Sequence, residues 1–276
     1  MRKSGWNPTR RNKNIGIKKQ GFSQNNKFVI PDRYENGEWV SFNENLIDPV
    51  IVPLNINGYE LILIIEPVYE SYIYSCTPQD IIKIMNLFPV QHFEETDLKI
   101  LIMRQPKSKD EIVSPVWGRF SYYQSFGQYA GTAITLEAMK VGLALKWGKK
   151  LSVFSMKELE MLRNDGHQVE AFKRYFLIQT TPESIRNTQL FRTIPHEMGH
   201  AYDYYLNSMK PSMEAWDRDD DAEGEYISEA FHSKPQLDKE EAANRYAKEF
   251  YEKYSISGEL PFGQIYDESS IRDMGL

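Results

Sequence analysis

Residues Thr193–Asp203 read TIPHEMGHAYD, and the interpretation of the whole chain starts from this stretch. It contains the pattern His-Glu-x-x-His, in which His196 and His200 are four residues apart. On an α-helix such positions lie on one face, so the two imidazoles can bind one Zn²⁺ ion. Glu197 lies about 100° around the helix from the first histidine. Its carboxylate is therefore placed to accept a proton from a water molecule at the metal.

The residues around the motif support this interpretation. The chain has only 5 histidines, and two of them fall at this spacing with an acid between them. Apolar residues recur at helical intervals on both sides and predict one amphipathic helix. These residues are Leu190, Phe191, Ile194, Met198, Ala201 and Tyr205. Gly199 lacks a side chain, so a neighbouring element can approach the helix closely at that point.

Pro195, directly before the first histidine, conflicts with a continuous α-helix. It has no backbone N–H, and its ring clashes with the carbonyl group of Phe191, four residues earlier. The sequence leaves two local geometries open. Either the helix kinks at this proline, or a new helical segment begins there.

A catalytic zinc site takes three protein ligands and leaves one position open. A second amphipathic helix is predicted over Asp238–Tyr251, and Glu240 points to the centre of its buried face, whereas Glu241 points to solvent. The apolar residues of that face are Ala243, Ala247, Phe250, Tyr251 and Tyr254. A carboxylate on an apolar face is unfavourable unless it is paired or bound to a metal. Glu240 is therefore the predicted third ligand, and the small Ala243 would allow the two helices to approach.

Other acids remain open as alternatives. Asp203 lies three residues after His200 on nearly the same helix face, where it can ligate the metal or accept the second N–H of a ligand imidazole. Glu225 and Glu229 are further candidates for the third ligand. Glu240 itself can be an acid that the helix dipole favours near the N-terminus. The acidic run 217–223 lacks the glycine and terminal glutamate of an EF-hand and is expected to be a solvated loop.

Composition limits the class of protein. The 276 residues are 41% hydrophobic and 26% charged, as in a folded globular protein, and the net charge of −6 makes nucleic acid an unexpected partner. The single cysteine, Cys76, excludes an internal disulfide and a cysteine-rich zinc finger and is typical of a reducing compartment. Neither a signal-peptide core within 1–25 nor a run of roughly 18 apolar residues is present. We therefore expect a cytoplasmic protein that has no membrane span.

The chain divides into three predicted parts. Residues 1–25 are a basic mobile tail, for which contact with nucleic acid or an acidic partner is the functional alternative. Residues 26–110 form a strand-rich lobe, and 111–276 form the domain with the site. The polar stretch Gln105–Glu111 marks the boundary, although it can equally be a surface loop within one domain. The predicted strands include a hairpin over 28–42 turning at Asn36-Gly37, then 50–52, 59–65, 68–74, 99–103, 119–123, 132–137 and 174–179. Residues 68–74 are expected to pair with the strand before them, across Pro67.

The two site segments resemble the zincin metallopeptidases of the glutamate-ligand, or gluzincin, branch. Residues 196–200 match the zinc motif of that family, and Glu240-Glu241-Ala242-Ala243 matches its downstream Glu-x-x-Ala form. Residues 196–203 are similar to the zinc helix of lethal-factor-type toxin peptidases. Residues 240–247 are similar to bacterial and phage peptidases that cleave immunity repressors. The resemblance spans roughly residues 115–255, and no metzincin-type Gly-x-x-His follows the second histidine.

This resemblance implies an α+β, zincin-like fold with a small twisted mixed sheet, a zinc-site helix and a second helix that bears the glutamate. Substrate is expected to lie extended along an edge strand, for which Thr132–Glu137 is the candidate. The implied function is a zinc-dependent endopeptidase in which His196, His200 and Glu240 hold Zn²⁺ and Glu197 is the catalytic base acting on a peptide or protein substrate.

Two other functions and one residue choice stay open. The chain can be a catalytically silent zincin-like module that binds a partner or DNA, for which the basic tail is the only support. It can also hydrolyse an amide that is not a peptide. An oxyanion-stabilising Tyr or His is expected, but 17 tyrosines leave the choice open. His232 and Tyr246 are near enough in sequence to test.

Overall fold

The computed structural model describes residues 33–35, 38–40, 46–68, 70–106, 117–140, 142 and 144–273. The chain forms two compact units, 1–45 and 46–276. In the first unit, Arg33–Glu35 (β1) pairs antiparallel with Glu38–Val40 (β2), on either side of the predicted turn. The predicted basic tail and the predicted start of this hairpin at 28–30 lie outside the described residues.

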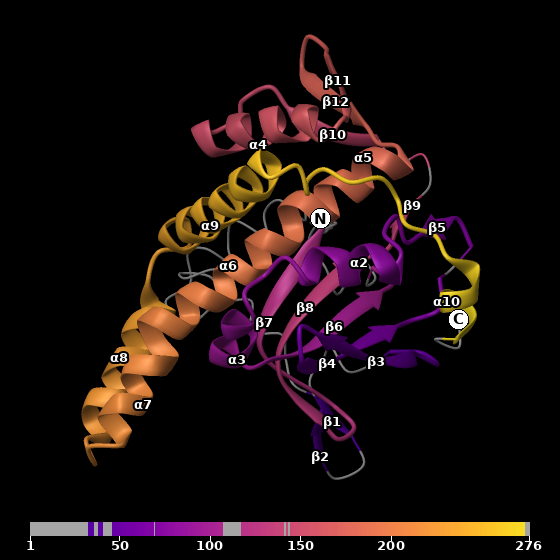
Figure 1. Ribbon diagram of the computed structural model, residues 1–276. Coiled ribbons are helices and arrows are strands. Elements are labelled where there is room, and N and C mark those ends of the chain that lie inside the picture. Colours follow the sequence, from indigo (N-terminus) through magenta and orange to yellow (C-terminus); the bar gives the residue numbers. More distant parts are fainter. Residues whose placement is uncertain are drawn as a thin grey trace, which may run out of the picture. The chain divides into compact units, whose positions relative to one another are not determined.

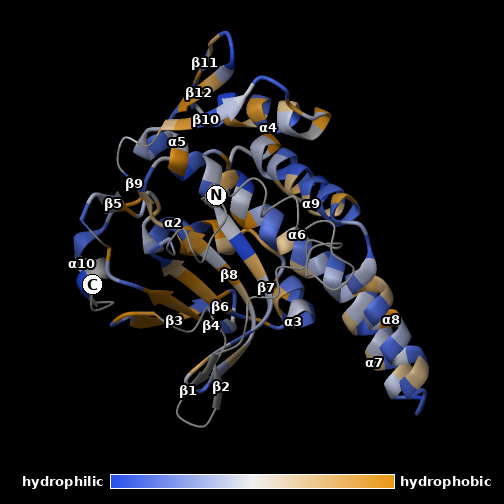
Figure 2. Ribbon diagram, turned by 180° about the vertical axis from the view of Figure 1, so that it is seen from behind, coloured by the Kyte–Doolittle hydropathy of each residue, from blue (hydrophilic) through white to orange (hydrophobic). Residues whose placement is uncertain are grey.

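A five-stranded mixed sheet organises the second unit (Figure 1). Its strands are Val50–Ile56 (β3), Tyr59–Ile65 (β4), Leu98–Arg104 (β6), Gly118–Phe126 (β7) and Tyr129–Glu137 (β8). They lie in the order β3-β4-β6-β8-β7; β4, β6 and β8 are parallel, and the outer strands are antiparallel to their neighbours. Together with the helices this is an α+β fold, as predicted. In Figure 2 the strands of this sheet are coloured largely as hydrophobic.

The sheet does not follow the domain boundary predicted near residue 110. Strand β6 precedes that point and β8 follows it, yet the two pair along their length, with Ile102 opposite Thr135. A strand-rich lobe at 26–110 is therefore not separate from the part that holds the site. The alternative, in which residues 105–111 connect elements of one domain, agrees with this pairing.

Two strand predictions were wrong in their pairing. Thr132–Glu137 was expected at a sheet edge, but it belongs to β8, which is paired on both sides and buried along residues 131–137. The edge strands of this sheet, among the described residues, are β3 and β7, and β7 is the one beside the site helix. Residues 68–74 were expected to pair with the preceding strand; instead Tyr72–Ile73 (β5) pairs with Met139–Lys140 (β9), far along the chain.

Helices cover the sheet and continue into the site. The helices that precede the site are Pro78–Met85 (α2), Val90–Thr96 (α3) and Val153–Asn164 (α4). Helix α4 begins after Ser152, whose hydroxyl accepts a hydrogen bond from the Ser155 N–H at 3.0 Å. The helices that follow the site helix are Asp221–Ser233 (α8), Gln236–Ile256 (α9) and Glu268–Asp273 (α10). Among the described helices, none is both long and apolar enough to cross a membrane.

The site helix belongs to one long helical path. Its segments are Pro182–Asn187 (α5), a π-helical turn at Thr188–Thr193 (η2), Ile194–Tyr204 (α6), a second π-helical turn at Tyr205–Met209 (η3) and Lys210–Trp216 (α7). The first π-helical turn resolves the conflict at Pro195, because the Ile194 N–H bonds to the Gln189 carbonyl, five residues back. The wider turn lets the path continue through the proline. Pro211 follows the second π-helical turn in the same way.

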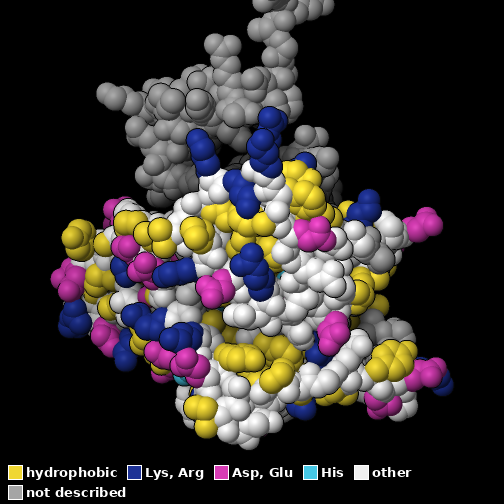
Figure 3. Space-filling model, turned by 90° about the horizontal axis from the view of Figure 1, so that it is seen from above, with side chains coloured by type: hydrophobic (Ala, Val, Ile, Leu, Met, Phe, Trp, Pro, Cys, Tyr) yellow, Lys and Arg dark blue, Asp and Glu magenta, His cyan; other side chains and the backbone are white. Residues whose placement is uncertain are grey.

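A small second sheet lies beside this path. Its strands are Ala144–Gly148 (β10), Gln168–Ala171 (β11) and Tyr175–Gln179 (β12), in the order β10-β12-β11. One face packs on α4 through a core of Leu159, Leu162 and Ile178. On β10, Lys146 lies with its ammonium 3.9 Å from the Tyr175 ring centroid. Figure 3, which views the molecule from above, shows lysine and arginine side chains beside hydrophobic ones.

The contact between α6 and α9 depends on a glycine. Helix α9 lies along α6 (Figure 1). A Cβ atom on Gly199 would lie 2.8 Å from the Ala243 Cα and 2.9 Å from its carbonyl oxygen. The close approach expected from the two small residues is therefore present. On the sheet side, Ile194 and Met198 are buried in the main core, as their helical spacing predicts.

We expect Gly199→Ala to destabilise the chain although alanine is the better helix former. Alanine gains about 1 kcal/mol of helix propensity, but overpacking against backbone atoms costs about 1–3 kcal/mol. Urea denaturation should show a net loss of stability of up to about 2 kcal/mol. The control is Gly263→Ala, whose added Cβ meets no atom within 4 Å. Equal stability of the two variants would contradict the tight α6–α9 contact.

Candidate metal centre

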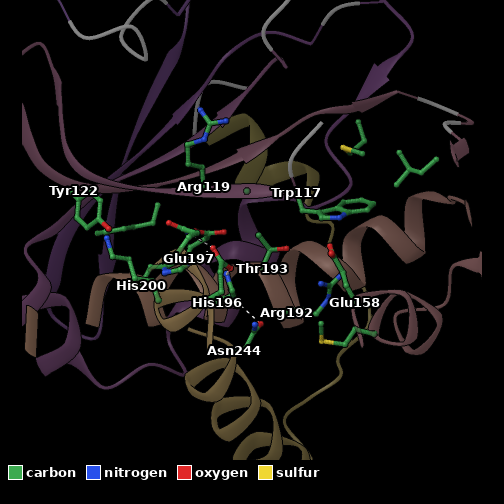
Figure 4. A pocket seen from close by; sticks show the side chains of 18 of the residues that line it. Trp117, Arg119, Tyr122, Glu158, Arg192, Thr193, His196, Glu197, His200 and Asn244 are labelled. Atoms are coloured by element: carbon green, nitrogen blue, oxygen red, sulfur yellow. Dashed lines mark hydrogen bonds and ion pairs between the residues drawn. The ribbon is translucent and has the colours of Figure 1, made fainter. Parts of the chain in front are cut away.

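The structure brings the three predicted ligands to one place (Figure 4). His196 and His200 project from α6, and Glu240 projects from the first turns of α9. The Nε2 atom of His196 lies 3.2 Å from Glu240 Oε2, and that of His200 lies 3.7 Å from Glu240 Oε1. One ligand atom from each residue lies within 4.8 Å of the others. The site therefore joins two imidazoles and one carboxylate from distant parts of the chain.

This donor set fits a zinc ion. Zinc binds imidazole nitrogen and carboxylate oxygen at about 2.0–2.2 Å in tetrahedral geometry. Two such ligands stand about 3.4 Å apart, and the observed separations of 3.2 and 3.7 Å lie on either side of that value. Three ligands also leave one coordination position open, which is the arrangement of a catalytic zinc.

The alternative third ligands do not join this cluster. Asp203 lies on α6 and accepts a hydrogen bond from Asn207 at 2.9 Å. Glu225 and Glu229 lie exposed on α8. Among the described residues, only Glu240 contributes a carboxylate to the group that can hold a metal.

Polar side chains on α9 orient the cluster. The Asn244 Oδ1 atom lies 3.1 Å from His196 Nδ1, and the Gln236 amide donates to Glu240 Oε1 at 2.7 Å. A carboxamide oxygen only accepts, so His196 donates from Nδ1 to Asn244, and Nε2 is the atom that faces the centre. Asn244 received no role from the sequence. Its position one helical turn after Glu240 is the signal that could have found it.

Charge interactions keep the cluster ready to bind a cation. Burial, with the positive charge of His196, lowers the pKa of His200 to about 4, so this imidazole is neutral at pH 7. Burial opposes the charged form of Glu240, but its hydrogen bond with His196 outweighs burial and lowers the pKa of Glu240, and the same contact raises the pKa of His196. A neutral imidazole and an ionised carboxylate are the forms that bind zinc.

Glu197 is turned toward the edge strand and not into the ligand cluster. Its side chain is buried, with 8% of the residue exposed. Burial raises its pKa to about 7, although the positive charge of His196 and a hydrogen bond from the backbone of Phe120 lower it. The carboxylate therefore faces β7 from below, beside the metal centre (Figure 4). A carboxylate whose pKa lies near 7 can accept and return a proton at neutral pH.

A cleft of about 660 Å³ runs over the centre and under β7. The start of β7 lies against the site helix, because a Cβ on Gly118 would stand 2.5 Å from Thr193 Cγ2. In a strand, the N–H and C=O of a residue point to one side and alternate along the chain. Since the Phe120 backbone reaches Glu197, the main-chain groups of Phe120 and Gly118 face the cleft. Within the described part of the chain this edge of β7 pairs with no other strand, and it forms one wall of the cleft.

Tyr122 is the functional candidate that the sequence did not single out. It lines the cleft near His200, and burial together with the charge of Asp203 raises its pKa to about 12, so the hydroxyl keeps its proton. Of the two residues named earlier, His232 contacts the Tyr122 ring edge at 5.2 Å between centroids. Tyr246 is instead bonded to His92 Nδ1 at 2.6 Å and does not line the cleft.

Comparisons with protein-family models, with curated proteins and with solved structures find no match for this chain. The geometry of the site therefore carries the functional argument by itself.

Metal analysis tests the centre directly. We expect purified wild-type chain to bind about one Zn²⁺, and Glu240→Gln to weaken binding by more than about 100-fold. Asn244→Ala should weaken it by about 10–100-fold, because outer partners of a ligand histidine have effects of that size. Glu225→Gln, on the exposed face of α8, is the matched control and should bind as wild type. If the control lost zinc and Glu240→Gln kept it, Glu240 would not be the third ligand.

Proposed function

We propose that this chain is a zinc-dependent endopeptidase. The observation that supports it most is the position of Glu197, a buried carboxylate that lies between a three-ligand cluster and a free strand edge. An edge strand beside such a centre can hold an extended peptide through main-chain hydrogen bonds. This feature favours a peptide over an amide of another kind, since a small amide would not need a strand edge.

His196, His200 and Glu240 would hold the ion. Bound Zn²⁺ supplies a Lewis acid that lowers the pKa of water to about 7 and polarises a carbonyl group. Glu197 accepts the proton as water oxygen bonds to the scissile carbonyl carbon. The same carboxylic acid then gives this proton to the leaving nitrogen as the C–N bond breaks, so one water is consumed and a carboxylate and an amine are formed.

Tyr122 is our candidate for stabilising the oxygen of the scissile carbonyl as charge develops on it. Its protonated hydroxyl is a hydrogen-bond donor on the strand side of the cleft, opposite His200. A preorganised donor directed at developing charge is typically among the largest contributions to catalysis.

Replacing the proposed base tests the reaction and separates it from a binding-only role. Glu197→Gln keeps the shape and the three ligands, so we expect full zinc content and peptide hydrolysis at least about 1,000-fold slower. A mass-spectrometric digest of a peptide library measures both the activity and its loss. A function of the chain that survives this substitution would favour the silent, partner-binding alternative.

Tyr122→Phe removes only the hydroxyl and should lower kcat by about 100-fold with zinc content unchanged. Tyr123→Phe is the control, because Tyr123 is the next residue of β7 and is 68% exposed. The two variants are compared by single-turnover hydrolysis of one library peptide. An undiminished rate in Tyr122→Phe would remove this residue from the mechanism.

A further inference from the structure

The cleft continues past the metal centre into an end that the proposed chemistry does not use. Large apolar side chains form this end, and they come from the residue just before β7, from β9, from β10 and from α4. They are Trp117, Met139, Leu145, Trp147 and Met161. We refer to these five residues, with Glu158 and Arg192, as the side chamber. Figure 4 shows Trp117, Glu158 and Arg192 together at one end of the cleft, away from Tyr122.

The walls of the side chamber are fixed by packing. Trp117, Leu145 and Trp147 pack against the core of the small sheet, which includes Leu159. The Trp117 ring also lies 5.3 Å from the ring of His167. Side chains held in this way lose little conformational freedom when a ligand binds, so the chamber is formed before substrate arrives.

Glu158 gives the side chamber its charge. It lies on the inner face of α4, one residue before the buried Leu159, and its carboxylate is directed toward Trp117 (Figure 4). Among the described residues no hydrogen bond or ion pair is made by this carboxylate. Burial raises its pKa, although the nearby charge of Arg192 lowers it, so this carboxylate is only partly compensated. Outside the metal centre and Glu197, it is the only carboxylate among the described residues that line the cleft.

Arg192 offsets only part of that charge, because it lowers the pKa of Glu158 without reversing the effect of burial, and it is itself paired with another acid. Its Nε atom donates to Asp165 at 2.8 Å, and Asp165 also accepts from Thr188 at 2.7 Å. The guanidinium is therefore paired from behind by an acid that does not line the cleft. The remaining charge of the side chamber is negative, and this excludes an acidic side chain as the favoured occupant.

Resting on the proposed peptidase function, we propose that the side chamber binds a lysine or arginine side chain of the substrate. The cationic head would lie against Glu158 and near the faces of Trp117 and Trp147, because tryptophan faces attract cations most strongly. Arg192 lies four residues before His196 on the same helical path. The chamber is thus about one turn from the centre, and the cationic residue lies next to the bond that is cut.

The first test needs no catalysis. With 5-fluorotryptophan incorporated and the resonances assigned by Trp117→Phe and Trp147→Phe, N-acetyl-arginine amide is titrated against its neutral isostere, N-acetyl-citrulline amide. We expect the arginine probe to shift both resonances with about tenfold higher affinity. Glu158→Gln should bring the ratio near one, whereas Glu160→Gln, exposed on the same helix, should preserve it. Equal binding of both probes by wild type overturns the proposal.

The second test uses zinc-loaded chain and a peptide library read by mass spectrometry. Cleaved peptides should carry Lys or Arg at one fixed position beside the cut, with kcat/KM about tenfold above the citrulline peptide. Glu158→Gln should lower that ratio to near one, with circular dichroism and zinc content as checks of its folding. Probe binding without any cleavage would leave the cation site standing and refute the peptidase. Cleavage without a preference for Lys or Arg would support the peptidase and refute the cation site.

Discussion

The whole centre depends on how closely two helices approach at one point. Gly199 on α6 and Ala243 on α9 bring the two backbones together, with no room for a single additional methyl group. That contact sets Glu240 one turn before Ala243 on α9, opposite two imidazoles whose own spacing is fixed by α6. The 3.2 and 3.7 Å separations between carboxylate and imidazole are therefore a consequence of backbone packing. Larger side chains at Gly199 and Ala243 would move the helices apart and would not keep these separations.

The environment of the centre divides similar acids into different roles. Glu240 meets imidazoles and keeps its charge, whereas Glu197, one residue after a ligand, is buried under β7 and its pKa rises to about 7. The two carboxylates differ because one is paired and the other is desolvated. Glu158, on a third element, is desolvated without a partner at the far end of the same cleft.

The sequence predicted local features well and long-range ones poorly. Helical spacing placed Glu240 on the buried face of α9, and the structure brings it to both histidines. Residues 59–65 were predicted as a strand with the bounds that β4 has. The edge strand was missed because strand order depends on pairing between β6 and β8, which are separated along the chain by β7. Tyr122 was missed for the same reason: only the position of β7 at the edge brings it to the cleft. Nothing in the sequence tests the zinc-peptidase assignment itself, which stays a proposal.

The π-helical turn at Thr188–Thr193 has a consequence for how this chain tolerates change in length. Such a turn holds about one residue more than an α-helical turn. Removing one residue from it would restore regular geometry to the path, but everything that follows would rotate by about 100°. His196 and His200 would then face away from Glu240, and Pro195 would meet the carbonyl that the wider turn avoids. The length of the segment before the motif thus sets the rotation of α6 about its axis. That length is constrained as tightly as the identity of the histidines.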